Sequence, residues 1–461
     1  MTITPEAAAT HSAAPVPALA TPPRPARPLS SFGLLRTFTT NSLAACDAEL
    51  FEELLVERRY FWGRAFVVSD PDGMRRVLQD NTDNYQRIAA FRRIFAFSGG
   101  GGMVCLEGED WWRHRRVVNP ALDQRALRPD LPTLIALTEE MARLLAEVPS
   151  GEQFELGRTL QHLITRATGH VWAGDEPAID RMVLRMGRYP EKYSVFDLFP
   201  IPAALRAVAR WRKSRSGLDP YYKLLDRLIA ERRDPGYAGG KDLLWRLAHT
   251  PDRQTGRRLT DGEIRDEVLT LSATAATPLR AMVWLWYLLA LHPWADERLA
   301  DELDRAFGDR SPRPDDFAKL AYLRRLVDEA MRLYPPLPLT LRVAVADDTV
   351  CGRRVPRGSV VAVAPFVVHR HTKLWQDPER FDPDRFTPEQ SRGRPRYAYI
   401  PFGVGPHVCP GAALAMNEIL ITVAILARRF RFRLVPGHRV EPTAWTTLRP
   451  KDGLMVTLEK R

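Results

Sequence analysis

One short segment constrains this chain more than any other: residues 401–411, PFGVGPHVCPG, place a single cysteine, Cys409, among glycines and prolines. Glycine lets the backbone turn tightly and approach a flat ligand that side chains would keep away. The residues after Cys409 have a helical pattern, so its sulfur is expected at a helix N-terminus. There the helix dipole and the free N–H groups favour a thiolate. The segment therefore predicts an anionic sulfur beside a glycine-lined surface.

Three chemical roles compete for Cys409. A disulfide is disfavoured, because the four cysteines (Cys46, Cys105, Cys351 and Cys409) are scattered and form no Cys-x-x-Cys pair, which fits a reducing compartment. A nucleophile needs a base, and although His407 is close in sequence, no orienting carboxylate follows it. A metal ligand is favoured, since a backbone-cradled thiolate beside a glycine platform is what a thiolate-ligated haem needs.

Apolar residues recur every three to four positions over long stretches, which predicts helices. These stretches are residues 131–146, 156–171, 203–212, 221–233, 260–291 and 317–333. Short β-like segments come late, at residues 343–345, 359–363 and 454–458, and the aromatic and glycine-rich residues 87–103 are expected to form a loop. We expect a mainly α fold with a small β region (α+β), as one domain over residues 33–461 after a flexible Ala/Pro-rich segment, residues 1–32.

The charge and hydropathy of the chain bear on its partners and location. A formal net charge of +11 raises the question of nucleic acid, but the arginines are spread along amphipathic helices without zinc-finger spacing, so no nucleic-acid partner is expected. The longest apolar run, residues 281–291, is about half of the ~20 residues that span a membrane. Residues 1–32 lack the apolar core of a signal peptide. We expect a cytoplasmic protein without a membrane anchor.

The cysteine segment resembles the haem-binding signature of the cytochrome P-450 family, F-x-x-G-x-[RH]-x-C-x-G. The matching residues are Phe402, Gly405, His407, Cys409 and Gly411. The resemblance implies a single-domain cytochrome P-450 fold that encloses a b-type haem (haem b, iron protoporphyrin IX). It also implies that Cys409 is the axial ligand of the iron and that Phe402, His407 and Gly411 bind the cofactor.

Further motifs of that family follow in the expected order. Glu329-x-x-Arg332 lies in a helical segment, and the sequence FDPDRF supplies Arg385. The resemblance implies that these three residues form a buried structural network. Removal of one member would leave a buried charge unpaired and lower the free energy of unfolding by about 3–5 kcal/mol.

The segment GEDWWRHRR resembles the family helix whose tryptophan and arginine bind the haem propionates. Trp111 with Arg115 and Trp112 with Arg116 both fit the spacing, and the distance to Pro120 favours Trp111 with Arg115. Two more positions, Arg342 and His407, match family residues with the same role.

The predicted long helix departs from the family pattern, which carries an acid followed by a threonine that relay protons to iron-bound dioxygen. In one alignment Thr277 takes the threonine position and Ala276 the acid position; in the other Thr277 takes the acid position and Pro278 the threonine position. In the first alignment the carboxylate is missing. Pro278 lacks an N–H, so the helix is expected to distort there. Thr277 is the predicted catalytic residue.

The resemblance implies a haem-thiolate monooxygenase that inserts one oxygen atom from O2 into a C–H bond of an apolar small molecule. Electrons would come from a separate ferredoxin or flavodoxin with its reductase. Arg113, Arg116 and Arg428 are candidates for the docking face. The pocket is expected from residues 88–97, 193–199, 273–277 and 337–340 and from the surroundings of Trp445. A peroxide-using haem-thiolate peroxygenase and a non-catalytic haem-binding sensor are the alternatives.

Overall fold

Helices make up most of the structure. The computed structural model describes residues 18–22, 24–97, 101–187 and 218–461. The helices are α1 (Ser31–Thr40), α2 (Pro71–Arg75), α3 (Ala89–Phe97), α4 (Gly108–Ala121), α5 (Gln124–Leu127), α6 (Leu131–Ala146), α7 (Leu156–Ala173), α8 (Pro177–Gly187), α11 (Asp219–Arg233), α12 (Leu243–His249), α13 (Asp261–Thr274), α14 (Thr277–Leu291), α15 (Pro293–Phe307), α16 (Ala321–Leu333), α17 (Pro365–Val368), α18 (Pro388–Ser391) and α19 (Ala412–Arg429).

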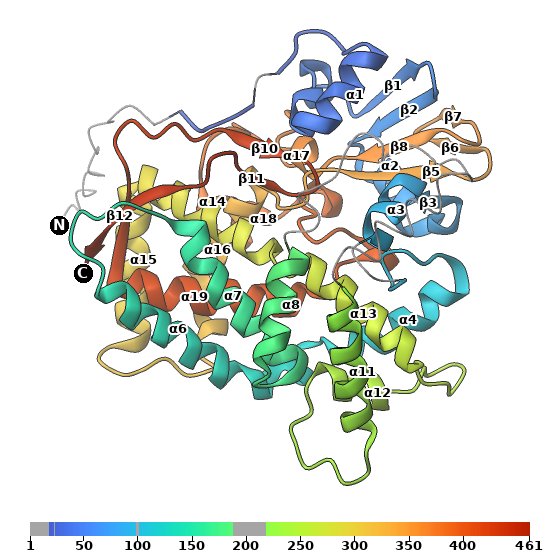
Figure 1. Ribbon diagram of the computed structural model, residues 1–461. Coiled ribbons are helices and arrows are strands. Elements are labelled where there is room, and N and C mark those ends of the chain that lie inside the picture. The colour runs from blue at the N-terminus through green and yellow to red at the C-terminus, as the bar shows by residue number, and fades with distance from the viewer. Residues whose placement is uncertain (1–17, 23, 98–100, 188–217) are drawn as a thin grey trace, which may run out of the picture.

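The strands are short and come from distant parts of the chain. They are β1 (Leu55–Tyr60), β2 (Gly63–Val68), β3 (Tyr85–Arg87), β4 (Phe154–Glu155), β5 (Thr340–Ala344), β6 (Asp348–Val350), β7 (Arg353–Val355), β8 (Val360–Val363), β9 (Phe430–Leu434), β10 (Pro442–Ala444), β11 (Leu448–Pro450) and β12 (Met455–Lys460). The largest sheet has the order β1-β2-β8-β5-β3 and lies to one side of the helical body (Figure 1). The predicted mainly α fold with a small β region is confirmed.

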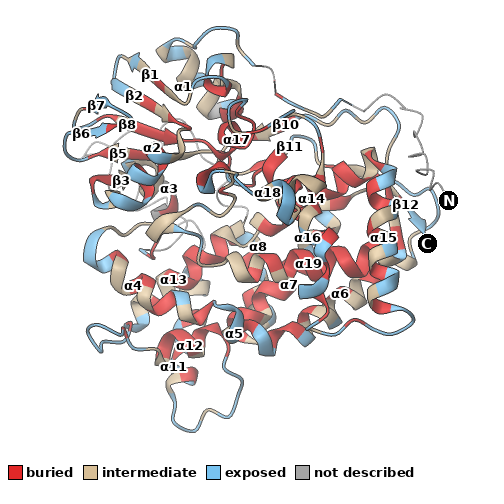
Figure 2. Ribbon diagram, turned by 180° about the vertical axis from the view of Figure 1, so that it is seen from behind, coloured by how far each residue is buried: buried red, intermediate tan, exposed pale blue. Residues whose placement is uncertain are grey.

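The core of the helical body is formed by helices that are apolar on nearly every side. Most side chains of α14 and α19 are buried, and Figure 2 shows both helices largely in red, inside a shell of more exposed elements. A helix that is apolar all round belongs in the interior of a large protein. Within the described residues, one helical run, Asp261–Leu291, has the length and composition to cross a membrane, and 72% of its most apolar window is buried inside the fold.

Two predicted elements differ from the structure. Residues 89–97 form the helix α3, so the predicted loop is wrong there, because the glycines lie at 99–102 and the preceding Ala-Ala-Phe-Arg-Arg-Ile sequence is compatible with a helix. The predicted helix over residues 260–291 is divided into α13 and α14 at Ala275 and Ala276. The predicted helix at residues 203–212 lies outside the described residues.

The described part of the N-terminal segment is attached to the helical body. The Ala20 N–H donates to Tyr287 Oη at 3.0 Å, and Tyr334 Oη donates to the Ala20 carbonyl at 2.9 Å. Arg24 forms an ion pair with Glu379. Residues 1–17 and 23 lie outside the described residues, but from residue 18 onward these contacts differ from the flexible segment expected for residues 1–32.

One carboxyl group in the core has no cation beside it among the described residues. Glu418, on α19, is buried, and its Oε1 accepts a hydrogen bond of 3.0 Å from the Thr168 hydroxyl of α7. Burial raises the pKa of Glu418 to about 8, and the Thr168 hydrogen bond lowers it only partly. The folded protein therefore holds a proton here that the unfolded chain, with a glutamate pKa of about 4.3, releases.

This proton makes stability depend on pH. Between about pH 4.3 and pH 8 the folded state binds the proton more tightly, so the contribution of Glu418 to stability is lost as pH rises through this window. We expect Glu418→Gln to remove the dependence, so that its gain in unfolding free energy over the wild type grows by up to about 1.4 kcal/mol per pH unit. Urea unfolding at pH 5 to 8 measures this gain. Glu389→Gln, at an exposed site, is the control, and parallel curves for Glu418→Gln and wild type would contradict the expectation.

Candidate functional site

The turn before Cys409 is fixed by two glycines with left-handed backbone conformation. Gly403 has φ 72° and Gly405 has φ 70°, values that residues with a Cβ rarely adopt. A Cβ on Gly405 would overlap the carbonyl oxygen of Leu78, which belongs to the single helical turn Arg76–Asp80. The Cys409 N–H closes the turn by donating to the Phe402 carbonyl at 2.8 Å. Gly405 therefore allows the cysteine turn to lie directly against a second backbone segment.

Substitution of Gly405 tests this close approach. We expect Gly405→Ala to lower the unfolding free energy through backbone strain of about 1–2 kcal/mol and through overlap with Leu78, typically about 1–3 kcal/mol more. Gly437→Ala is the matched control, because Gly437 has φ 79° but nothing within 4 Å of an added Cβ. Equal losses for the two variants, measured by urea denaturation, would show that the overlap is relieved at no cost.

The Cys409 thiol lies just before the N-terminus of α19 and is exposed. Desolvation by the surrounding protein raises the pKa of the thiol, whereas the Gly411 N–H, which hydrogen-bonds to the sulfur, and the nearby Arg115 lower it. An accessible sulfur amid dense protein is expected at the wall of a concave site. Desolvation is the largest influence, so the pKa of the Cys409 thiol is raised on balance, while the Gly411 N–H and Arg115 oppose it by stabilising the thiolate, the form that binds metals.

Cations gather next to this thiol. Arg342 on β5 stands directly opposite Arg87 on β3 in the antiparallel register, although like charges placed opposite each other destabilise a sheet. Arg87 Nη2 donates to His407 Nδ1 at 2.7 Å, and the ring of His407 lies 3.9 Å from that of Trp111. Arg115, on the same helix as Trp111, donates to the carbonyl of Val408. Three arginines from separate elements thus surround one spot.

Some hydrogen-bond donors in this cluster have no acceptor in the described part of the chain. Trp111 Nε1 and Arg115 Nε are buried without a hydrogen-bond partner among the described residues. Glu107, which pairs with Arg87 at 3.4 Å, is a carboxylate that acts on the buried Arg342. Burial and the nearby Arg87 lower the pKa of Arg342 to about 10, and burial together with Arg87, Arg342 and Arg115 lowers that of His407, which keeps the ring neutral. Buried cations and donors are costly without an acceptor. The cluster therefore fits a bound group that carries carboxylates.

The structure separates the two frames considered for the tryptophan and arginine pair. Trp111 and Arg115 are both buried and belong to the cationic cluster. Arg116 instead binds Asp252 at 2.6 Å and Glu109 at 2.6 Å. The frame with Trp111 and Arg115 agrees with this geometry.

The arginines considered for docking are engaged elsewhere. The side chains of Arg113 and Arg116 are only 12% and 16% exposed, and Arg113 pairs with Glu263. Arg428 donates to backbone carbonyls at Gly308 and Arg310. Arg113 and Arg116 therefore present little free charge, whereas Arg428 keeps its charge, and the docking role of these three residues stays a prediction.

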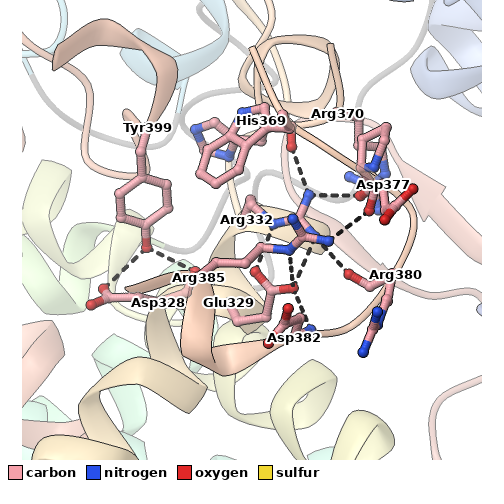
Figure 3. A network of polar contacts seen from close by, with 12 residues as sticks. Asp328, Glu329, Arg332, His369, Arg370, Asp377, Arg380, Asp382, Arg385 and Tyr399 are labelled. Carbon is pink, nitrogen blue, oxygen red and sulfur yellow. Dashed lines mark hydrogen bonds and ion pairs between the residues drawn. The ribbon is translucent and has the colours of Figure 1, made fainter. Parts of the chain in front are cut away.

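A second polar network lies around α16 (Figure 3). Arg332 Nε and Nη2 donate to the two carboxylate oxygens of Glu329 at 2.6 and 2.9 Å, and both side chains are fully buried. Arg332 also donates to the carbonyls of His369, Pro378 and Arg380, which belong to the segment between β8 and α18. Arg385 Nε lies 3.8 Å from Glu329 Oε1. The structure thus brings together the three residues predicted for this network.

Thr277 begins α14 at the break in the predicted long helix. Pro278 has no N–H for the carbonyl of Thr274, one turn earlier, and Thr277 Oγ1 donates to that carbonyl instead, at 2.7 Å. Ala275 and Ala276 fill the turn between the two helices. The helix is distorted next to Pro278, as expected: the distortion is the turn at Ala275 and Ala276, just before α14 begins at Thr277.

Arg87 is a site residue that the sequence alone did not identify. The structure describes some of the segments expected to line the pocket. Arg87 joins the cluster because β3 pairs with β5, and the short sequence Tyr-Gln-Arg gives no sign of that pairing. Residues 88–97 contain α3, 273–277 form the helix break, and Trp445 lies between β10 and β11. Residues 193–199 lie outside the described residues.

A thiol at a glycine turn, beside a cluster that accepts carboxylates, defines a site for a flat, metal-bearing anionic cofactor. The chain belongs to the cytochrome P450 family, whose model, described as Cytochrome P450, matches residues 23–458. It is 30% identical over 466 residues to the putative cytochrome P450 132 of Mycobacterium bovis, covering 95% of this chain and 97% of that protein. It is 38% identical over 360 residues to cyclooctatin synthase of Streptomyces melanosporofaciens, covering 74% and 75%.

The solved structures agree on the fold. The crystal structure of the cytochrome P450DA haem domain superimposes with a TM-score of 0.81 at 23% identity, covering 95% of this chain and 97% of the other. The family carries a haem and uses O2, an organic substrate and a redox partner. The chain is therefore a cytochrome P450 monooxygenase.

Proposed function

We propose that this enzyme inserts one oxygen atom from O2 into a C–H bond of an apolar cyclic molecule. The observation that carries the proposal is the accessible Cys409 thiol beside a cluster of buried cations with unused donors. In support, similar proteins have the names cyclooctat-9-en-7-ol 5-monooxygenase (31% identical) and pentalenene oxygenase (28% identical). A cyclic hydrocarbon or its mono-alcohol is the substrate class that we assign to this chain.

We infer that the cofactor is haem b and that Cys409 is its axial ligand. Arg115, Arg342 and Trp111 would bind the two propionates, with His407 beside them, and Arg87 would complete that group. Gly411 and Phe402 would shape the turn around the sulfur through the backbone hydrogen bonds at Cys409. The haem, when bound, supplies the chemistry that activates O2, and a thiolate ligand favours O–O cleavage.

We assign Thr277 a role in handling protons near the reacting oxygen. Its hydroxyl lies at the helix break and already donates to the Thr274 carbonyl, so it can accept a hydrogen bond from a neighbouring donor. Electrons would come from a separate ferredoxin or flavodoxin with its reductase, in the cytoplasm.

A spectral titration of the purified ferric protein tests this function. A panel of cyclic hydrocarbons and mono-alcohols, pentalenene among them, is added while the low-spin to high-spin shift is recorded. We expect a saturable shift for at least one compound, followed by its hydroxylation with O2, NADPH, a ferredoxin and its reductase. Hydroxylation with hydrogen peroxide alone would instead indicate a peroxygenase. A thiolate spectrum with carbon monoxide but neither shift nor turnover would indicate a sensor.

A further inference from the structure

A run of polar groups leads from the surface toward the break between α13 and α14. Glu263 is 28% exposed, and its Oε1 lies 3.6 Å from Nε2 of His114. His114 Nδ1 lies 2.6 Å from Glu267 Oε1, and these two side chains are only 3% and 0% exposed. Arg113 pairs with Glu263, and its Nη2 also lies 3.4 Å from His114 Nε2. Against the effect of burial, Arg113 and Thr260 lower the pKa of Glu263 to about 2, so Glu263 stays a carboxylate. The buried pair of His114 and Glu267 is therefore the part of this run that is available as a relay.

Glu267 has an unused oxygen at the inner end of this run. Its Oε1 accepts hydrogen bonds from His114 and, at 2.7 Å, from the Met103 N–H. Its Oε2 is buried without a hydrogen-bond partner in the described part of the chain, and the same is true of Thr270 Oγ1, one helical turn later. Buried polar atoms are nearly always satisfied by protein or by ordered water. One ordered water molecule that contacts both the carboxyl group and the hydroxyl group would satisfy both atoms.

Thr270 is covered by backbone. A Cβ on Gly102 would lie 2.6 Å from Thr270 Oγ1 and 2.8 Å from the Asp266 carbonyl, so the loop before α4 lies directly against α13 at this point. Bulk solvent is excluded from Thr270 while the carboxyl of Glu267 stays connected to His114.

The same face of the helix continues to the break. Glu267, Thr270 and Thr274 are spaced by three or four residues, so they lie on one side of α13. Glu267 and Thr274 are about 10 Å apart at the rise of an α-helix. Thr277 follows the two-residue break and donates to the Thr274 carbonyl. Between residues 261 and 291 carboxylates occur only at 261, 263, 266 and 267. Glu267 is therefore the carboxylate nearest to the break along this run, and Ala276 supplies none.

We propose that His114, Glu267 and Thr270 form a proton-relay path for the oxygen insertion described under Proposed function, on which this inference rests. The reaction RH + O2 + 2 e⁻ + 2 H⁺ → ROH + H2O takes its electrons from the ferredoxin or flavodoxin and needs two protons from solvent. His114 takes up a proton at Nε2 and passes one from Nδ1 to Glu267 Oε1. Glu267 releases a proton from Oε2 to water at Thr270, and the run continues along α13 to Thr274, whose carbonyl accepts from Thr277.

The test compares two ways of driving the haem-loaded enzyme with the compound that gives the largest spectral shift. Glu267→Gln keeps an acceptor for the Met103 N–H but carries no exchangeable acid proton, and Thr270→Val removes the hydroxyl at constant shape. Thr138→Val is the matched control, because Thr138 is a buried threonine on α6 whose hydroxyl bonds only to its own helix, at the Leu134 carbonyl. Product and hydrogen peroxide are measured with O2, NADPH, a ferredoxin and its reductase, and product is measured again with hydrogen peroxide as oxidant.

We expect product formation with O2 to fall about 100-fold in Glu267→Gln, the lower range for loss of a positioned proton donor, with electrons diverted to hydrogen peroxide. The peroxide-driven reaction brings its own protons and should fall at least about tenfold less. On the protein without substrate, the infrared carboxyl band that disappears in Glu267→Gln should shift in Thr270→Val, because one water contacts both groups. Parallel losses in the two reactions, unchanged coupling, or a band that Thr270→Val leaves in place would overturn the proposal.

These outcomes are distinct from a failure of the proposed function. If no compound shifts the spectrum or is hydroxylated, the wild type itself is inactive and the function is wrong. If the wild type hydroxylates a compound while both relay variants match Thr138→Val, the function stands and the relay is wrong. If Glu267→Gln does not fold, Thr270→Val tests the relay instead: a lower ratio of product to hydrogen peroxide than in Thr138→Val supports it, and an equal ratio overturns it.

Discussion

Cys409→Ala abolishes the hydroxylation of any substrate found by spectral titration and removes the thiolate-type spectrum of the reduced protein with carbon monoxide. Loss of the ligand itself should cost more than the 10–100-fold typical of residues that only support a metal ligand, that is, at least about 100-fold. The sulfur is the one thiol that lies in the glycine turn before α19, beside Arg115. Absorbance spectra and product analysis measure both effects.

The control for this variant is Cys351→Ala. Cys351 lies between β6 and β7, and its thiol hydrogen-bonds to Asp70, away from the cationic cluster. We expect this variant to keep its spectrum and its activity. A Cys409→Ala protein that folds, binds haem and still shows the thiolate spectrum would refute Cys409 as the ligand.

We expect Arg332→Leu to lower the free energy of unfolding more than Gly405→Ala or Arg324→Leu does. Arg332→Leu leaves the fully buried Glu329 carboxylate with only Arg385, 3.8 Å away, as a cation and removes donors from the carbonyls of His369, Pro378 and Arg380. Removing one partner of a buried pair costs about 3–5 kcal/mol, a large part of a typical total stability of about 5–15 kcal/mol. Chemical denaturation measures the loss, with soluble yield as a second readout.

A matched substitution on the same helix separates the network from general effects of charge. Arg324 is 52% exposed and pairs with Asp328 one turn away, so Arg324→Leu should cost no more than about 0.2–1 kcal/mol. The double variant Glu329→Leu with Arg332→Leu should recover part of the loss, because the buried carboxylate is removed together with its main cation, although Arg385 loses a carboxylate 3.8 Å away. Equal stability of Arg332→Leu and Arg324→Leu would contradict a structural role for the network.

The parts that sequence could predict are those written in local spacing. Helical periodicity marked α6, α7, α16 and the α13 to α14 run, because their packing faces repeat every three to four residues. Pro278 signalled the break, since a missing N–H acts on its own helix. The glycines around Cys409 likewise control the turn in which they lie.

The parts that sequence could not predict depend on contacts between distant segments. Arg87 enters the cationic cluster only through the pairing of β3 with β5, and a three-residue strand carries too little pattern to show it. Arg113 pairs with Glu263 and Arg116 pairs with Asp252, and both carboxylates lie far along the chain. Two residues that looked like surface cations in the sequence therefore form ion pairs between distant segments. The contact of Glu267 with His114 likewise needed the packing of α4 on α13.

The attachment of Ala20 has a practical consequence for anyone who prepares the protein. A chain shortened to begin at residue 33, the boundary that the Ala/Pro-rich composition recommends, would lose both backbone bonds to the phenols of Tyr287 and Tyr334, two residues of the helical core. It would also lose the cation that faces Glu379. Affinity tags and cleavage sites are best placed ahead of residue 18, so that the purified protein keeps the segment from residue 18 onward that bonds to the helical core.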